Sequence, residues 1–216
     1  MPRNARIFQK SICYHLLNRG VNRMDIFTND LDRQYFLQLI SDYKKACDAR
    51  IYHWVLMGNH YHIIVELAFE NLRAFAGGIQ QSYAQYHHKR HRTSGVFWQG
   101  RFKSKPVEIG SYLVACGRYI ERNPVRVGWS ELAWNYPWSS AAHYVLNVKD
   151  GVTDLNPYLG AFTAQDRVRY GEVLLSGSDE AIIRETVSSR VIGSSRYART
   201  LKTERGRQRL KRGRKA

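Results

Sequence analysis

Two adjacent stretches, Ile51-Tyr-His-Trp-Val-Leu-Met57 and His60-Tyr-His-Ile-Ile-Val-Glu66, are separated only by Gly58-Asn59. Both stretches are rich in β-branched and aromatic residues, and a two-residue linker of this type is typical of a tight hairpin turn. The sequence therefore predicts an antiparallel β-hairpin. Because side chains alternate across a strand, His60 and His62 should lie on the same face of it.

The segments on both sides of this hairpin alternate between strand and helix patterns. In chain order they predict a strand at 11–17, a helix at 30–48, the hairpin strands at 51–57 and 60–66, a helix at 70–91, a strand at 101–107 and a helix at 109–122 that Asn123-Pro124 should stop. This order predicts an α+β fold of the ferredoxin-like, split βαβ type: a four-stranded antiparallel sheet with helices on one face.

We expect three regions along the chain. A catalytic-type domain should span residues 1–147 and close with a short helix at 139–146. A helical extension should follow at 148–195, with two helices within 163–190. Residues 196–216 are so polar and basic that we expect a flexible DNA-binding tail.

The 216-residue chain carries a net charge of +16, unevenly distributed along its length. Residues 1–127 hold 19 basic and 9 acidic side chains, 128–195 hold 5 and 8, and 196–216 hold 10 and 1. A field of this strength attracts polyanions, and nucleic acid is the expected partner. An anionic membrane is disfavoured because the basic tail has no apolar face to insert.

Other classes of protein are excluded by composition. No apolar run approaches the roughly 18 residues of a membrane span, and the basic N-terminus lacks the apolar core of a secretory signal. The three cysteines, Cys13, Cys47 and Cys116, are odd in number and never spaced as Cys-x-x-Cys. We therefore expect reduced thiols in a bacterial cytoplasm, with the protein associated with nucleoid DNA.

The pair His60 and His62 is the first candidate for chemistry. Two imidazoles on one strand face suit a divalent metal ion. Histidines two residues apart are also common on exposed strands without any metal, so the pair alone leaves both interpretations open.

Tyr119 and Asn123 form the second candidate, because a spacing of four residues places both on one face of a helix. A tyrosine can serve as a nucleophile, and an amide oxygen can bind a hard cation. With 14 tyrosines in the chain, most are expected in the core, on the surface or against nucleic-acid bases.

A third feature is a set of basic side chains interleaved with aromatic residues, which suits single-stranded nucleic acid. The candidate DNA contacts are Arg19, Arg23, Arg90, Arg92, Arg101, Lys103, Lys105, Arg118, Arg122, Arg207, Arg212 and Arg214. Two tail segments of the form Arg-Gly-Arg resemble minor-groove-inserting sequences. For the tail we favour nonspecific binding of phosphates, which should weaken steeply with salt.

Taken together, the sequence resembles the HUH single-tyrosine transposases, and more closely the REP-associated tyrosine transposases. The matching stretches are Tyr14-His-Leu-Leu-Asn-Arg-Gly20, Trp54-Val-Leu-Met-Gly-Asn-His-Tyr-His-Ile-Ile-Val65, Trp98-Gln-Gly-Arg-Phe-Lys103, Tyr119-Ile-Glu-Arg-Asn-Pro-Val-Arg126 and Tyr136-Pro-Trp-Ser-Ser140. The resemblance covers residues 8 to about 145 and implies the same ferredoxin-like fold.

The resemblance also implies roles for individual residues. His60 and His62 match the histidines that bind Mg²⁺ or Mn²⁺, and Asn123 occupies the position of a third metal ligand. Tyr119 matches the nucleophile that forms a 5′-phosphotyrosine. The implied substrate is single-stranded DNA that carries imperfect hairpins, the repetitive extragenic palindromes (REP elements). Because the ordinary pKa of tyrosine is about 10, Tyr119 needs help to ionise, from the metal or from Arg118 and Arg122.

Two other functions remain as alternatives at this stage. The protein could bind hairpin DNA or RNA without cleaving it, or it could be a zinc-binding regulator that uses His60, His62 and Cys116. We expect a monomer whose active site forms within one chain, with a dimer that shares its tyrosine helices as the alternative.

Overall fold

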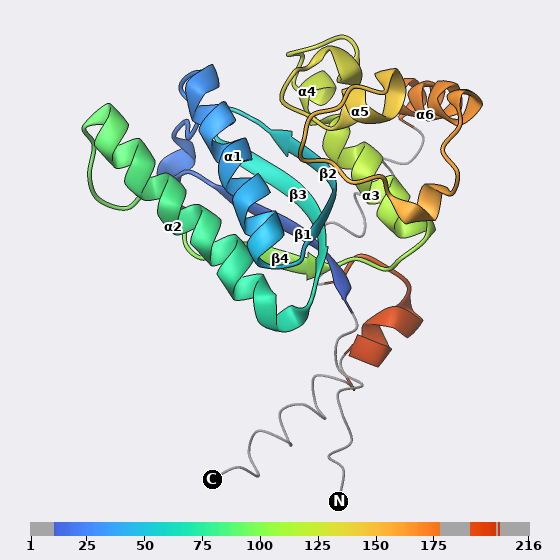
Figure 1. The fold of residues 1–216 in the computed structure, drawn as a ribbon, viewed down its shortest axis with the longest axis horizontal. Helices are drawn as coiled ribbons and strands as arrows, with labels where there is room; N and C mark the ends of the chain where they lie inside the picture. Colours follow the sequence, from blue (N-terminus) through green and yellow to red (C-terminus); the bar gives the residue numbers. More distant parts are fainter. Residues whose placement is uncertain (1–10, 178–190, 202, 204–216) are drawn as a thin grey trace, which may run out of the picture.

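The computed structural model describes residues 11–177, 191–201 and 203. Its centre is one antiparallel sheet (Figure 1) in the order β2-β3-β1-β4. The strands are β1 (Ile12–Arg19), β2 (Arg50–Leu56), β3 (His60–Leu67) and β4 (Lys103–Pro106). The predicted four-stranded antiparallel sheet is confirmed, although β4 begins two residues later than expected.

The hairpin between β2 and β3 closes as its sequence predicts. The backbone N–H of Met57 donates to the carbonyl of His60 at 2.9 Å, so Gly58 and Asn59 form the two-residue turn. β3 then pairs with β1 over its whole length, with Arg19 opposite His60 and Leu17 opposite His62. The turn thus fixes which residues of β1 lie beside the two histidines.

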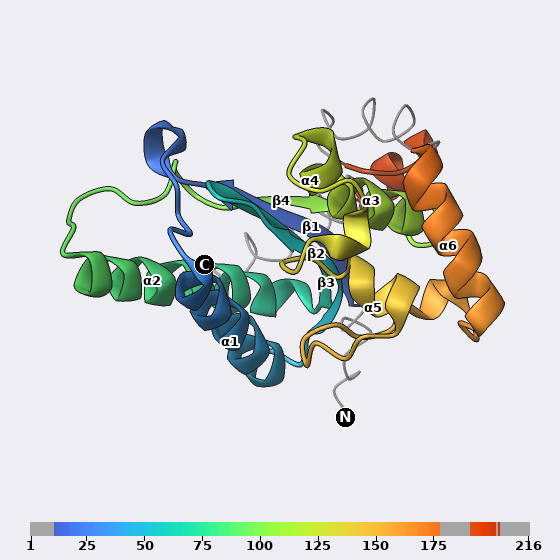
Figure 2. The same ribbon diagram turned by 90° about the horizontal axis from the view of Figure 1, so that it is seen from above.

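Helices α1 (Asp30–Ala46) and α2 (Leu72–His91) cover one face of the sheet, as predicted (Figure 2). The side chain of Asn29 caps α1 by accepting from the backbone N–H of Asp32 at 3.2 Å. Gly78 lets the two helices approach closely, because a Cβ there would collide with the ring of Tyr43. Short 3₁₀ turns, η1 (Val21–Arg23) and η2 (Phe69–Asn71), precede α1 and α2.

Helix α3 (Ser111–Glu121) crosses the opposite face of the sheet (Figure 2). Its buried residues Leu113, Cys116 and Ile120 pack in one cluster with Val55 of β2 and Ile64 of β3. His60 and His62 share the side-chain parity of Ile64 on β3, so they point to the same face. The histidine pair therefore lies on the α3 side, and the α1–α2 side is the larger apolar core.

The predicted end of the chain's third helix at Asn123-Pro124 is wrong in one respect. A second short helix, α4 (Asn123–Arg126), starts there directly after α3. Pro124 fits because it occupies the first turn of α4, where a backbone N–H has no partner within the helix. The turn between α3 and α4 brings Arg126 back beside Tyr119.

The chain beyond α4 wraps around the edge of β2. Leu56 N–H donates to the carbonyl of Trp138 at 2.9 Å, and Ser140 N–H donates to the carbonyl of Trp54 at 3.0 Å. This pairing covers an otherwise open strand edge. The remaining elements are η3 (Ala133–Asn135), α5 (Ala141–Leu146), η4 (Pro157–Leu159) and α6 (Ala164–Ser176), which share a small apolar cluster with α3.

The last described segment returns to the sheet. Ile192 is fully buried and pairs in parallel with Val107, residues 195–201 are helical, and Leu201 is buried. This differs from the expected flexible tail, because an apolar residue at 201 gives the segment something to bury. The second helix expected within 163–190 falls largely at 178–190, and that segment and residues 204–216 lie outside the described residues.

Two expectations from composition can be compared with the structure. Cys13, Cys47 and Cys116 are all buried free thiols, as expected. In the part of the chain that the structure describes, no helix has the length and apolar character needed to cross a membrane.

Candidate active site

His60 and His62 lie side by side at the end of β3 nearest the hairpin turn. Their ring centroids are 5.2 Å apart and the rings are perpendicular. In each ring Nδ1 already has a partner: the side-chain oxygen of Asn59 lies 2.6 Å from that of His60, and Nε2 of His15 lies 2.8 Å from that of His62. The Nε2 atom of each histidine is thus the ring nitrogen left to bind a metal ion.

His15 is a site residue that the sequence reasoning missed. It lies on β1, fully buried, with its ring stacked on that of His62 at 5.0 Å between centroids. Its second nitrogen, Nδ1, is buried without a hydrogen-bond partner. When Nδ1–H of His62 donates to His15, Nε2 of His62 carries the free lone pair that a metal ligand needs. His15 falls within a quoted motif, but only the strand register reveals its contact.

The electrostatics keep these histidines neutral. Burial, then the nearby Arg19 and Arg126, lower the pKa of His60 to about 4. Burial also lowers the pKa of His62 well below its usual value, with His15, His60, Arg126 and Lys105 adding to the effect. Neutral imidazoles are the form that binds metal ions, so both ligands are ready at neutral pH. Among the described residues, neither ring pairs with a carboxylate.

Tyr119 projects from α3 on the face of the sheet that holds the histidine pair, partly buried against the α3-side cluster. The guanidinium of Arg126 lies over its ring, 3.9 Å from the ring centroid. The same guanidinium lowers the pKa of both His60 and His62. Arg126 therefore connects the tyrosine to the histidine pair, and it is the second residue that sequence reasoning missed.

Asn123 begins α4, one helical turn after Tyr119. Its amide nitrogen donates to the carbonyl of Ile120 at 2.8 Å, and its side-chain oxygen accepts from Arg126 at 2.8 Å. That oxygen can bind a cation only after Arg126 moves away. The role of Asn123 as a metal ligand remains a prediction.

Arg118 and Arg122 do not lie where assistance to Tyr119 would need them. Arg118 lies over the ring of Tyr170, 5.7 Å from its centroid. Arg122 donates to the backbone carbonyls of Leu174 and Leu175 at the end of α6. A cation there satisfies carbonyls that a helix end leaves open. The guanidinium beside Tyr119 is that of Arg126, and DNA contact by the other two stays a prediction.

Several predicted DNA contacts surround the histidine pair. Lys103 and Lys105 lie on β4 opposite Leu17 and His15 of β1, so they share the sheet face of His62. Burial, then the charge of Lys103, lowers the pKa of Lys105. Arg19 is paired with His60 across the sheet and hydrogen-bonds Gln99. Arg101 precedes β4 and is exposed.

The remaining predicted contacts are not brought to the histidine pair. Arg23 is exposed in η1, and Arg90 and Arg92 lie at the C-terminal end of α2 on the other side of the sheet. Arg207, Arg212 and Arg214 lie outside the described residues. Among described residues Cys116 joins no metal-binding group with His60 and His62, and burial raises its pKa to about 12. The zinc-regulator alternative therefore loses its third ligand.

This geometry can be compared with known proteins. Residues 8–123, just over half of the chain, match the family described as "Transposase IS200 like". The chain belongs to this family. The match includes His60, His62, Tyr119 and Asn123, and it ends before Arg126. No curated protein sequence matches the chain.

Solved structures support the fold of this IS200-like transposase. A REP-associated tyrosine transposase bound to a REP hairpin is 21% identical, with a TM-score of 0.54 over 72% of this chain and 90% of the other. A candidate transposase from Deinococcus radiodurans R1 is 15% identical, with a TM-score of 0.39 over 56% of this chain and 97% of the other. The first likeness establishes a shared fold with a DNA-bound transposase.

Proposed function

We propose that this IS200-like transposase is a metal-dependent single-stranded DNA endonuclease and strand transferase, with Tyr119 as nucleophile. The observation that carries the proposal is the arrangement of His60, His62, Tyr119 and Arg126 on one sheet face. Two neutral imidazoles, one phenol and one guanidinium are the groups that phosphodiester cleavage through tyrosine requires.

The histidine pair fits a hard divalent cation that still needs oxygen ligands. With only two nitrogen ligands from β3, a bound ion keeps positions for phosphate and water oxygens, as Mg²⁺ and Mn²⁺ prefer. Asn123 would add an oxygen once Arg126 releases it. The ion supplies Lewis-acid polarisation of the scissile phosphate and neutralises charge on the departing oxygen.

The protein's own groups carry the transfer step. The phenolic oxygen of Tyr119, having lost its proton, forms a bond to phosphorus, and the bond from phosphorus to the 3′ oxygen breaks. The DNA 5′ phosphate stays on the tyrosine, and the departing strand takes up a proton as a 3′-hydroxyl. Attack by a 3′-hydroxyl on the same linkage reverses the step and joins strands without ATP. The positive charge of Arg126 favours the phenolate and the added charge at phosphorus.

Basic side chains next to the histidine pair give the DNA strand a path. Lys103 and Lys105 of β4 and Arg19 of β1 lie on the same face as His60 and His62. They would hold the backbone phosphates that flank the scissile bond. REP-like hairpins are the proposed substrate, since the similar DNA-bound structure is a complex with a REP hairpin.

A cis active site in a monomer follows from the contacts of Arg126. One chain supplies both histidines, Tyr119 and the guanidinium that influences all three. We place this activity in the bacterial cytoplasm, where the DNA substrate is found.

The test is cleavage of 5′-tailed hairpin oligonucleotides, taken from repeats near the gene, with Mg²⁺ or Mn²⁺ on denaturing gels. Wild type should give a covalent protein–DNA band and a cleaved strand. Tyr119→Phe and His60→Ala should give neither, while Tyr112→Phe, a second partly buried tyrosine of α3, should retain both. If the hairpins bind tightly and wild type forms no adduct with any repeat, the protein is a hairpin-binding protein without turnover.

A further inference from the structure

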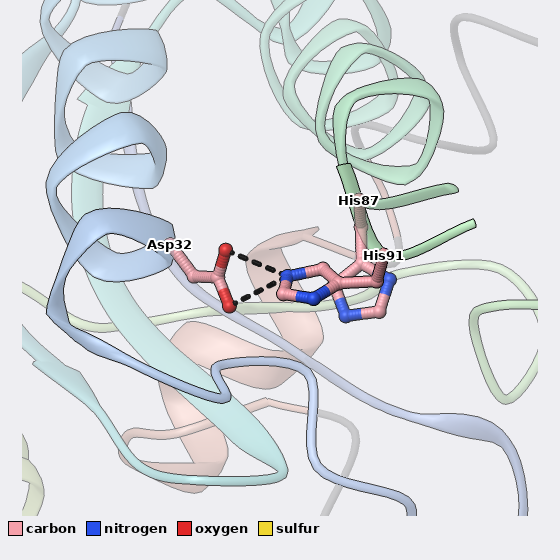
Figure 3. Close-up of side chains that lie close together, drawn as sticks. All are labelled: Asp32, His87 and His91. Atoms are coloured by element: carbon pink, nitrogen blue, oxygen red, sulfur yellow. Dashed lines mark hydrogen bonds and ion pairs between the residues drawn. The ribbon is translucent and has the colours of Figure 1, made fainter. Parts of the chain in front are cut away.

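A second group of metal-ligating side chains lies on the other side of the sheet (Figure 3). Asp32 comes from the first turn of α1, and His87 and His91 come from the last turns of α2. One ligand atom from each lies within 4.8 Å of the other two. Nε2 of His91 is 3.0 and 3.1 Å from the two carboxylate oxygens of Asp32.

His87 is the unusual member of this group. Its side chain is 3% exposed, yet neither ring nitrogen has a hydrogen-bond partner. Leaving a buried polar group unpaired costs stability. Its ring centroid lies 4.3 Å from that of His91, one helical turn further along α2, so the two imidazoles face the same space. A bound ion would give His87 the partner that the protein does not.

The spacing is close to that of a tetrahedral site. Zinc bonds to nitrogen and oxygen of about 2.0–2.2 Å place neighbouring ligand atoms about 3.3 Å apart. The Asp32–His91 separations are already near that value, and the third ligand atom needs to close in by at most ~1.5 Å, which side-chain rotation can supply.

The charges around the group also permit an ion. Asp32 is fully buried, and hydrogen bonds from Thr28 and His91 outweigh burial and lower its pKa, so it is an anion. Thr28 holds one oxygen of Asp32, through its N–H at 3.0 Å and its hydroxyl at 2.6 Å. Arg90 approaches the other oxygen at 3.3 Å, but its side chain is one-third exposed and can turn to solvent.

We propose that Asp32, His87 and His91 bind a first-row transition-metal ion, zinc above all, at a site separate from the catalytic histidine pair. Two imidazoles and one carboxylate suit Zn²⁺, Co²⁺ or Ni²⁺, whereas Mg²⁺ prefers a shell of oxygens. The bound ion would join the start of α1 to the end of α2.

The site also bears on the loop that returns to the catalytic face. The ring of Phe97 packs against His87 at 4.6 Å between centroids, and the carbonyl of Phe97 accepts from Val21 N–H at 2.9 Å. Two residues later, Gln99 hydrogen-bonds Arg19, the neighbour of His60. An ion on His87 would therefore stabilise the segment that leads from α2 to β4.

The test measures Zn²⁺ and Co²⁺ binding to tag-free protein that carries His60→Ala and His62→Ala, so that the catalytic pair cannot contribute. We expect one equivalent of Zn²⁺ in competition with a chromophoric chelator, and the intense visible bands of tetrahedral Co²⁺. A hundredfold excess of Zn²⁺ over its Kd should raise Tm by roughly 5–10 °C.

Added His87→Gln should abolish the Co²⁺ bands and the Tm shift and weaken Zn²⁺ binding at least ~10-fold. His88→Gln is the matched control, because His88 is the next residue of α2 and hydrogen-bonds only Thr93 among side chains. Retention of the bands in His87→Gln, or their absence from the parent, would overturn the proposal. The same pair of variants in otherwise wild-type protein, where one of two Co²⁺ equivalents should disappear, gives the answer if the parent folds poorly.

Discussion

His53 and His62 lie on neighbouring strands and on the same face of the sheet, yet their surroundings are opposite. Both nitrogens of His53 are partnered, Nδ1 by Glu121 at 2.9 Å and Nε2 by the amide of Asn156 at 3.2 Å. Glu121 also accepts from Ser140 at 2.6 Å and Tyr170 at 2.7 Å. His62 has His15 as its neutral partner and lies among cations.

The difference shows what separates a structural histidine from a reactive one in this fold. The His53 centre brings α3, the segment around Ser140 and α6 together around one buried carboxylate, and every group in it is satisfied. The His62 centre has no carboxylate to compensate its surrounding positive charge, which an anionic phosphate or a ligand-bound ion would meet. Residue type and strand face are the same, so the partners decide the role.

The largest expected effect is on catalysis at the reactive centre. His62→Ala should lower hairpin cleavage by more than ~100-fold, because it removes a metal ligand and not merely the support of one. Its Tm should change by only a few degrees, since the ring is not tied into the buried network. Cleavage rates and thermal melts of the same preparation check this, and a large Tm loss with retained activity would reverse the assignment.

The structural centre should respond in the opposite way. Glu121→Ala leaves His53, Ser140 and Tyr170 without their buried acceptor, which should cost about 3–5 kcal/mol. For a chain of this size that is a Tm loss of roughly 6–20 °C. Cleavage at a temperature where the variant is folded should stay within a few-fold of wild type. Strong loss of cleavage in the folded variant would show that the two centres are coupled.

His15 sharpens the comparison, because it supports the reactive centre without touching substrate. His15→Phe keeps a ring against His62 and removes a buried nitrogen that has no partner, so Tm should change little. Mn²⁺ affinity should nevertheless fall about 10–100-fold, as for other residues that hydrogen-bond a metal ligand. Titration calorimetry with Mn²⁺ measures this, and unchanged affinity would remove His15 from the site.

The smallest effect concerns a third buried histidine, His143 of α5. Burial lowers its pKa, so it is neutral in the folded protein, with its Nδ1 near the carbonyl of Val148 at 3.1 Å. Above pH 6.5 it is neutral in both states and its contribution is constant. Below that, the unfolded chain takes up the proton first, and stability falls by up to about 1.4 kcal/mol per pH unit. His143→Gln should lose less Tm between pH 7 and 5.5 than wild type.

Much of the fold could be predicted because its signals are local. The Gly58-Asn59 turn, the capping Asn29 and the helical spacing of α1 and α2 each depend on neighbouring residues. The end of α3 was misjudged because Pro124 does not block a new helix in whose first turn it lies. Residues 195–201 were misjudged because charge in the tail concealed one buried leucine.

The candidate site was predictable in its motif residues and not in their partners. The alternation of His60 and His62 and the spacing of Tyr119 follow from sequence periods. His15, Arg126 and the Asp32–His87–His91 group depend on strand register and on contacts between distant segments, which no local period encodes. Arg122 shows the converse, since its position near Tyr119 in sequence did not bring it to the site.

The central claim is that Tyr119 becomes covalently linked to DNA, and peptide mass spectrometry tests it most directly. Wild type incubated with a cleavable hairpin and Mn²⁺, then digested with nuclease and trypsin, should yield a peptide that carries a 5′-linked nucleotide on Tyr119. Tyr119→Phe should yield no nucleotide-bearing peptide. A nucleotide on another residue, or cleaved hairpin with no modified peptide, would contradict the account.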